Sequence, residues 1–174
     1  MKTRIIVDST ADLMPEFKSR VHTVPLTVHF GQEEYTDGVT IDHKTFYEKL
    51  IETDVHPSTS QATPIAFEKE YEKLRETEDE AVVITLSSKL SGTYQSAMIA
   101  AQDYDNIYVV DSGSVAIGGG ILVEYALQLL KEGLSAKEIA DSCTEMRDRI
   151  DASFVVDDLE FQHKIHRLQK REIL

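Results

Sequence analysis

Short apolar runs that alternate with helical patterns are the feature that most constrains the fold of this chain. Runs rich in Ile and Val span residues 4–9, 81–86 and 106–112, and each is followed by a segment that can form a helix. Strands separated by helices favour a parallel sheet, because the crossover helices cover both of its faces. We therefore predict an α/β fold, with a mainly parallel β-sheet flanked by helices on both faces.

Capping residues indicate where the predicted helices begin and end. A polar residue that starts a helix bonds its free backbone N–H groups, and a glycine commonly ends one. Ser135 and Glu138 have the spacing of a capping box, in which each side chain bonds the backbone of the other. The other predicted caps are Asp42 before residues 43–52, Thr63 with Pro64 in the first helical position, and Gly133 at the end of 115–133.

The remaining segments are assigned from composition. Residues 21–30 are rich in β-branched residues and predict a strand, which Pro25 places at a sheet edge or interrupts. Residues 56–63 are polar and predict a loop. Near the end of the chain we predict a last strand over 151–158 and a terminal helix over 159–174.

Hydroxyl and carboxyl side chains gather where three of the apolar runs end. In open parallel sheets, ligands bind beyond the carboxyl ends of the strands. If these strands are parallel, their polar ends lie on one edge and form the mouth of a site. The side chains predicted to support this mouth are Asp8, Ser9, Ser88, Asp111 and Ser112.

The stretch LSSKLSGTYQSA, residues 86–97, holds six hydroxyl side chains where a strand gives way to a helix. A helix cap needs only one hydroxyl, so capping by Ser91 or Thr93 leaves most of them unexplained. The alternative is a cradle of hydroxyl and amide groups around a small anion, with Gly92 allowing close backbone approach. The polar loop before Pro64, with Thr59 and Ser60, is a second candidate cradle, or an ordinary loop.

Charge and missing motifs exclude several classes of function. The net charge of −13 argues against broad electrostatic binding to nucleic acid or to anionic membranes. No apolar run approaches the roughly 20 residues of a membrane-spanning helix. The sequence contains no phosphate-binding loop and no serine-hydrolase elbow, and His163 with His166 is too small a set to predict a metal site. The single cysteine, Cys143, fits a reducing cytosol, so we predict a cytoplasmic protein.

Six segments in order along the chain resemble one known family. They are DSTADL at 8–13, VPLTVHFG at 24–31, YTDG at 35–38, TSQATP at 59–64, LSSKLSGTYQSA at 86–97 and VVDS at 109–112. Together they resemble the DegV family of bacterial fatty-acid-binding proteins, the substrate-presenting partners of fatty acid kinase. TSQ followed by LSSKLSGTYQSA at this separation is the most specific part of the likeness.

The resemblance implies a carrier rather than an enzyme. A long-chain fatty acid is held between two domains while the catalytic subunit of a separate fatty acid kinase phosphorylates its carboxyl group. No cofactor, metal or nucleic acid is implied, and transient contact with a membrane is compatible with this role. By motif, the residues expected at the fatty acid carboxylate are Thr59, Ser60, Ser91, Gly92, Thr93 and Arg167.

The sequence departs from the family pattern at two places. Ala62 stands where family members commonly have proline, and Ile165 with His166 replaces a usual glycine pair, although Arg167 falls at the family's arginine. By the resemblance, we expect most of the family's second domain to be missing from this sequence. We therefore expect a DegV-type lipid-binding domain over residues 1–158, followed by the start of a truncated second domain over 159–174.

Two alternatives stay open at this point. The chain could be an enzyme or phosphocarrier subunit of the related dihydroxyacetone-kinase-like group, which binds a small phosphorylated or hydroxylated substrate. That role needs a nucleophilic histidine near the strand edge, and no histidine shares a motif with the hydroxyl clusters. The other alternative is a truncated chain that has lost its function.

Overall fold

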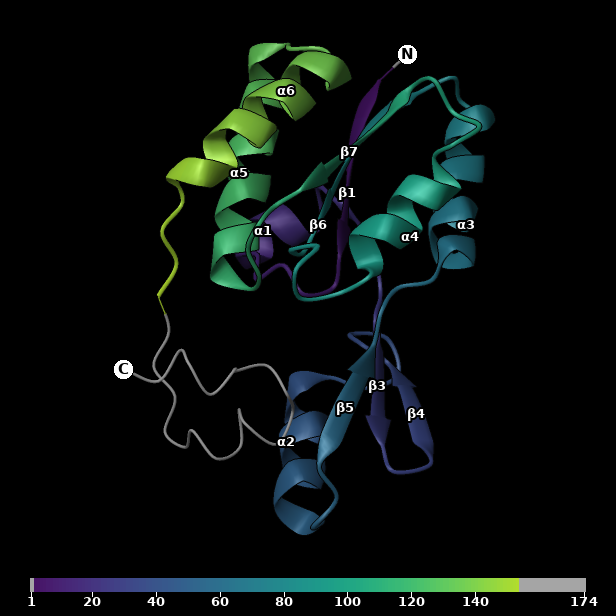
Figure 1. Cartoon of the computed structure of the whole chain (residues 1–174), viewed down its shortest axis with the longest axis vertical. Helices are drawn as coiled ribbons and strands as arrows, with labels where there is room; N and C mark the ends of the chain where they lie inside the picture. The colour runs from purple at the N-terminus through teal and green to yellow at the C-terminus, as the bar shows by residue number, and fades with distance from the viewer. Residues whose placement is uncertain (1, 154–174) are drawn as a thin grey trace.

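A parallel β-sheet with helices on both faces forms the larger part of the protein (Figure 1). The structure, a computed structural model, describes residues 2–153. The predicted α/β class and the parallel pairing of the three apolar runs are confirmed. The sheet has the strand order β2-β1-β6-β7, with β1 (Thr3–Asp8), β2 (His22–Val24), β6 (Glu80–Thr85) and β7 (Ile107–Asp111).

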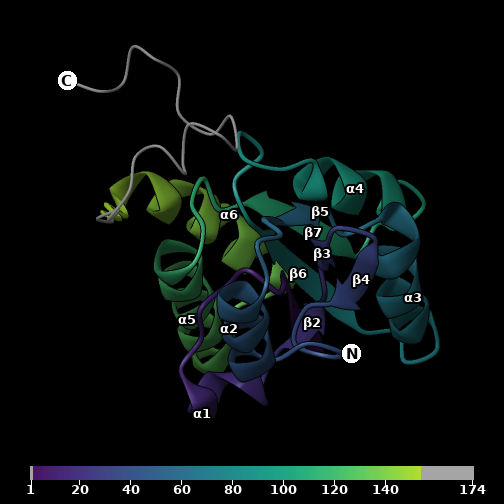
Figure 2. The same ribbon diagram turned by 90° about the horizontal axis from the view of Figure 1, so that it is seen from below.

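Successive side chains of each strand point to opposite faces of the sheet, so the core has two layers. Ile5 and Val7 of β1 pack with Leu122 on one face, whereas Ile6 packs with Phe67 on the other. Figure 2 shows the two helical layers from below, on either side of the sheet. The first face is covered by α1 (Pro15–Lys18), α5 (Ile117–Glu132) and α6 (Ala136–Met146), and the second by α3 (Pro64–Arg75) and α4 (Thr93–Ala100).

The predicted helix caps are confirmed. Asp42 accepts from the Thr45 N–H, Thr63 accepts from the Ala66 N–H, and Ser135 with Glu138 forms the capping box. Gly133, at φ 90°, ends α5 in the left-handed region that glycine adopts at little cost. Helix α6 ends at Met146, and a 3₁₀ turn over Arg147–Arg149 follows it.

A second, smaller sheet that the sequence did not predict lies beside the first, together with helix α2 (His43–Glu52) (Figure 1). It is antiparallel, in the order β4-β3-β5, with β3 (Thr27–Phe30), β4 (Glu33–Thr36) and β5 (Pro57–Ser60). The strand predicted over 21–30 is therefore two strands. The chain leaves the first sheet at Pro25, which lacks an N–H, and Leu26 donates its N–H to the Ser9 hydroxyl at 3.0 Å.

The loop predicted over 56–63 was also wrong in part, because residues 57–60 form β5. The sequence of β5, PSTS, lacks the alternation of apolar and polar residues that signals a strand. Backbone pairing with β3 holds this segment in the sheet. The predicted strand over 151–158 falls mostly outside the described residues, and residues 151–153 carry no regular structure. The predicted terminal helix and the domain boundary at residue 158 lie entirely outside them.

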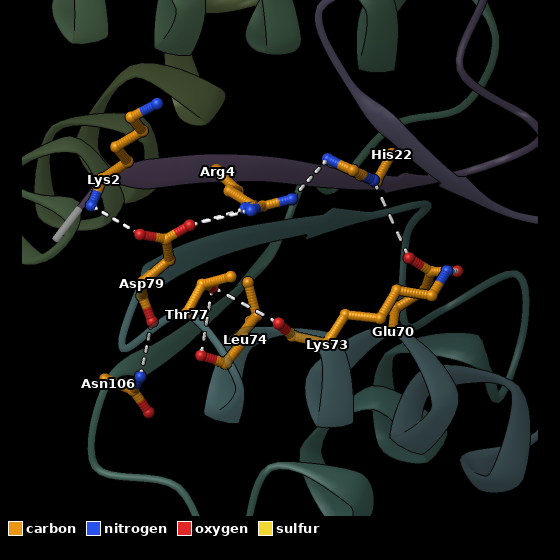
Figure 3. A network of polar contacts seen from close by, with 9 residues as sticks. All are labelled: Lys2, Arg4, His22, Glu70, Lys73, Leu74, Thr77, Asp79 and Asn106. Atoms are coloured by element: carbon orange, nitrogen blue, oxygen red, sulfur yellow. Dashed lines mark hydrogen bonds and ion pairs between the residues drawn. The ribbon is translucent and has the colours of Figure 1, made fainter.

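A polar network ties the amino end of β1 to the turn that precedes β6 (Figure 3). Asp79 accepts from the Lys2 N–H at 2.8 Å and from the Arg4 guanidinium at 2.9 Å, and its backbone carbonyl accepts from Asn106. The Lys2 amide and the Arg4 guanidinium lower the pKa of Asp79 to about 2. Since ligands of such sheets bind at the carboxyl ends of the strands, this network serves stability at the other end.

Candidate functional site

The carboxyl ends of β1, β6 and β7 lie side by side, and Asp8 joins the first two. Its Oδ1 accepts from the N–H and the hydroxyl of Thr10, at 2.9 and 2.6 Å, and its Oδ2 accepts from the Leu86 N–H at 2.6 Å. The side chain is buried, and burial raises the pKa of Asp8 against the effect of these three hydrogen bonds. Asp8 therefore holds the segments after two neighbouring strands together.

The other predicted supporting residues order the same edge through backbone contacts. Ser9 accepts from Leu26, where the chain passes to the small sheet. Asp111 accepts from the N–H groups of Ser88 and Gly113, at 3.1 and 2.9 Å. Burial works to raise the pKa of Asp111, but the hydrogen bonds from Ser88 and Gly113 outweigh it and the pKa is lowered. The Ser112 hydroxyl likewise donates to the Ser114 carbonyl and accepts from its N–H.

A cavity of about 230 Å³ between the two sheets brings the two predicted hydroxyl clusters together. Thr59 comes from β5 of the small sheet, and Ser91 from the turn before α4. Thr59 pairs directly with Val28 of β3, so the two side chains share the face that lines the cavity. The complete lining, named here the ligand cavity, is Thr10, Leu26, Val28, Asp37, Thr59, Gln61, Leu86, Leu90, Ser91 and Val115.

Thr93 and Gly92 hold the two hydroxyl clusters in contact. The buried Thr93 hydroxyl lies 3.0 Å from the Ser91 hydroxyl and accepts from the Ala62 N–H at 3.3 Å. Gln61 donates to Ser96 at 2.9 Å and lies so close to Gly92 that any side chain at Gly92 would collide with its carboxamide. The absence of a side chain at Gly92 thus lets the Gln61 carboxamide approach the backbone closely.

Neither Ser91 nor Thr93 caps α4 with its hydroxyl, although the sequence allowed one of them to do so. The N-cap position is Gly92, without a side-chain hydrogen bond. Ser91 accepts instead from the Thr93 N–H at 3.3 Å, a local turn that leaves its hydroxyl at the cavity.

Ser60 and Arg167 are not brought to the cavity by the described structure. Ser60 follows Thr59 on β5, so its side chain points to the opposite face, where it is hydrogen-bonded to His29 at 2.8 Å. Arg167 lies outside the described residues. Conversely, Gln61, Asp37 and Thr10 line the cavity although none was predicted as a site residue. Gln61 and Asp37 stood in quoted motifs, TSQATP and YTDG, but only the pairing of the sheets shows that they meet.

Two further cavities lie away from this pair of hydroxyls. One of about 250 Å³ is lined by Asp8, Ser9, Asp37, Lys18 and His43, among others. Another of about 380 Å³ lies along β7 between α4 and α6, and none of the predicted site residues lines it. Within residues 2–153, no group of three or more His, Cys, Asp or Glu residues is placed to hold a metal ion. None of the described helices is long and apolar enough to cross a membrane.

Comparison with known proteins identifies the family. The model described as "Uncharacterised protein, DegV family" matches residues 2–172. The chain belongs to the DegV family. A DegV domain-containing protein of Caldanaerobacter subterraneus subsp. tengcongensis is 36% identical over 175 residues, which cover 98% of this chain and 62% of that protein. This DegV chain therefore spans less than two thirds of that relative's length.

Solved structures of similar proteins share the fold. A DegV family protein from Thermus thermophilus, described as fatty acid binding, superposes with a TM-score of 0.82 at 33% identity, over 96% of this chain and 61% of that one. A stearic acid-binding protein from Eubacterium ventriosum superposes with a TM-score of 0.73 at 29% identity, over 82% of this chain and 52% of that one.

Proposed function

We propose that this DegV chain binds a long-chain fatty acid and that Thr59 and Ser91 hold its carboxylate in the ligand cavity. The observation that supports this most directly is the meeting of these two hydroxyls, one from β5 and one from the turn before α4, in a cavity that also has apolar walls. Hydroxyl donors suit a carboxylate oxygen, and Leu26, Leu86 and Leu90 suit the first methylenes of an acyl chain. The family resemblance and the fatty-acid-binding relatives supply the identity of the acid.

The carboxylate and the acyl chain of the ligand contribute differently to the binding free energy. A hydrogen bond to a charged group contributes about 1.5–3 kcal/mol, whereas each buried methylene contributes about 0.8 kcal/mol. For a long acyl chain the methylenes therefore supply most of the affinity, and the hydroxyls fix the position of the carboxylate. A cavity of about 230 Å³ lies below the usual range of ligand pockets, which starts near 300 Å³, so it suits the carboxyl end of the ligand.

The other predicted site residues have assigned parts in this proposal. Thr93 and Gly92 position Ser91, since they pack the segment after β5 against the start of α4. Arg167 adds a charge partner for the carboxylate, and Ser60 supports β5 from its far face.

The carrier role extends the proposal to a partner. The bound acid is presented to the catalytic subunit of a fatty acid kinase in the cytoplasm, which forms the acyl phosphate, and this chain supplies no cofactor or catalytic group. A phosphocarrier would need a histidine that faces the hydroxyls. No histidine of residues 2–153 lines the ligand cavity, and His43 lines the neighbouring one.

Titration calorimetry with octadecanoic acid tests the binding site. Thr59→Val and Ser91→Ala each remove one hydrogen bond to the carboxylate and should raise Kd roughly tenfold to hundredfold. Ser58→Ala is the matched control, because Ser58 is an exposed hydroxyl on the same strand and does not line the cavity. Unchanged affinity in both cavity variants would refute the assigned head-group site, and failure of this chain to bind the acid would refute the function.

A further inference from the structure

The turn that carries Ser91 spans residues 86–91, and every backbone N–H group in it donates a hydrogen bond. The first three N–H groups donate to acceptors outside the turn, and the last three donate to the hydroxyl or the carbonyl of Ser87. Ser91 itself donates its N–H to the Ser87 carbonyl at 3.2 Å. The hydroxyl that lines the ligand cavity therefore belongs to a turn whose backbone has fixed partners.

Asp111, at the end of β7, is one of the acceptors outside the turn. Its Oδ1 accepts from the Ser88 N–H at 3.1 Å and from the Gly113 N–H at 2.9 Å. One carboxylate oxygen therefore joins the Ser91 turn to the loop that follows β7. A displacement of Asp111 would release the Ser88 N–H, and the Ser91 hydroxyl on the same turn would lose its fixed place.

Arg147 fixes Asp111 from the end of α6. Its guanidinium donates from Nη1 to the Asp111 backbone carbonyl at 2.9 Å, and the Arg147 side chain is 31% exposed. Burial works to raise the pKa of Asp111, whereas the charge of Arg147 acts with the hydrogen bonds that this carboxylate accepts to lower it. Arg147 therefore holds the backbone of Asp111 in place and favours the ionised carboxylate, which is the stronger hydrogen-bond acceptor. Two successive contacts thus connect the end of α6 to the Ser91 turn.

We propose that Arg147 is a positioning residue for the ligand cavity: by fixing Asp111, it holds the Ser91 turn so that the Ser91 hydroxyl meets the ligand carboxylate. This inference rests on the proposed function, in which Ser91 is one of the two hydroxyls that bind the head group. Arg147 does not line the cavity, and none of the motifs along the chain includes it. Its effect on binding should therefore pass through Ser91 and disappear when the Ser91 hydroxyl is removed.

A double-mutant cycle measured by titration calorimetry with octadecanoic acid tests this link. Arg147→Met keeps the apolar stem of the side chain and removes its charge and its hydrogen-bond donors. In the otherwise wild-type chain it should raise Kd about fivefold, the loss expected when one hydrogen bond is loosened. In the Ser91→Ala background the same change should raise Kd less than about twofold, because no hydroxyl is left to position. In the Thr59→Val background it should again cost about fivefold, since Thr59 lies on β5 and not on the turn.

Arg149→Met is the matched control, because Arg149 is an exposed arginine of the same 3₁₀ turn, and it should leave Kd unchanged. If Arg147→Met does not fold, Asp111→Asn tests the same link in the same cycle, because it removes the charge of the acceptor and keeps its shape. An equal rise in Kd with and without the Ser91 hydroxyl, or no rise at all, would overturn the positioning role and leave the proposed function intact. If the wild-type chain binds no octadecanoic acid, the proposed function fails, and this inference fails with it.

Discussion

The three consecutive glycines at the start of α5 should respond very differently to the same substitution. Gly118, Gly119 and Gly120 follow one another in the sequence and all lie in α5. In the structure, a Cβ on Gly120 would collide with the backbone carbonyl of Asp12, whereas a Cβ on Gly119 meets no atom within 4 Å. Gly119 therefore has room for a side chain, whereas Gly120 has none.

The expected free energies follow from these two environments. Alanine in a helix interior is favoured over glycine by about 1 kcal/mol. Gly119 also lines a void of about 10 Å³, so Gly119→Ala should stabilise the protein by about 1 kcal/mol. At Gly120 the obstacle is backbone that cannot rotate away, and overpacking of this kind costs about 1–3 kcal/mol. Taking the upper end and subtracting the helix gain, Gly120→Ala should destabilise by about 2 kcal/mol.

Urea unfolding followed by circular dichroism measures this contrast of about 3 kcal/mol. With a slope near 2 kcal/mol per molar urea, the two midpoints should differ by roughly 1.5 M. Gly118→Ala should fall between them, because its Cβ would meet the Ser114 hydroxyl, which can rotate. Equal midpoints for Gly119→Ala and Gly120→Ala would refute the packing argument.

Two further predictions concern groups away from the cavity. Since the pKa of Asp79 lies at about 2, below its ordinary value of 3.8, its interactions should stabilise the fold above about pH 4 and lose that effect as the pH falls toward 2. Asp79→Asn should therefore be less stable than wild type in urea unfolding at pH 7, with the gap narrowing toward pH 2; a constant gap would contradict the assignment. Burial raises the pKa of the Cys143 thiol to about 12, so iodoacetamide at pH 8 should label it only when the protein unfolds. Rapid labelling in native buffer would show that the α6 core is less closed than described.

Local chemistry explains which parts of the fold were predictable. The caps Asp42, Thr63 and Ser135 depend on residues within one helical turn, and all were correctly predicted. The parallel edge followed from the connectivity of apolar strands and helices. Strand β5 carries a proline and three hydroxyl side chains and depends on pairing with β3, more than twenty residues earlier, so its own sequence gave no strand signal.

The ligand cavity was likewise predictable only in part from the sequence. The motifs indicated Thr59 and Ser91 as neighbours, and the structure places both in one lining. They did not indicate that Ser60 faces away, which follows only from the alternation of a strand that was predicted as a loop. Asp37 stands in the YTDG motif, and its place in the cavity depends on the backbone contact with Leu26.

The chain passes from the larger sheet to the small sheet at Leu26 and leaves the small sheet at Gln61. Both residues line the ligand cavity, so the two crossing points lie near each other. Residues 27–60 are thus an insertion that supplies one wall, with Val28, Asp37 and Thr59, while the larger sheet supplies the wall that carries Ser91. Such an arrangement makes half of the site modular. Exchange of residues 27–60 between family members would transplant one wall while the scaffold and the Ser91 turn stay in place, so ligand preference can diverge without rebuilding the core.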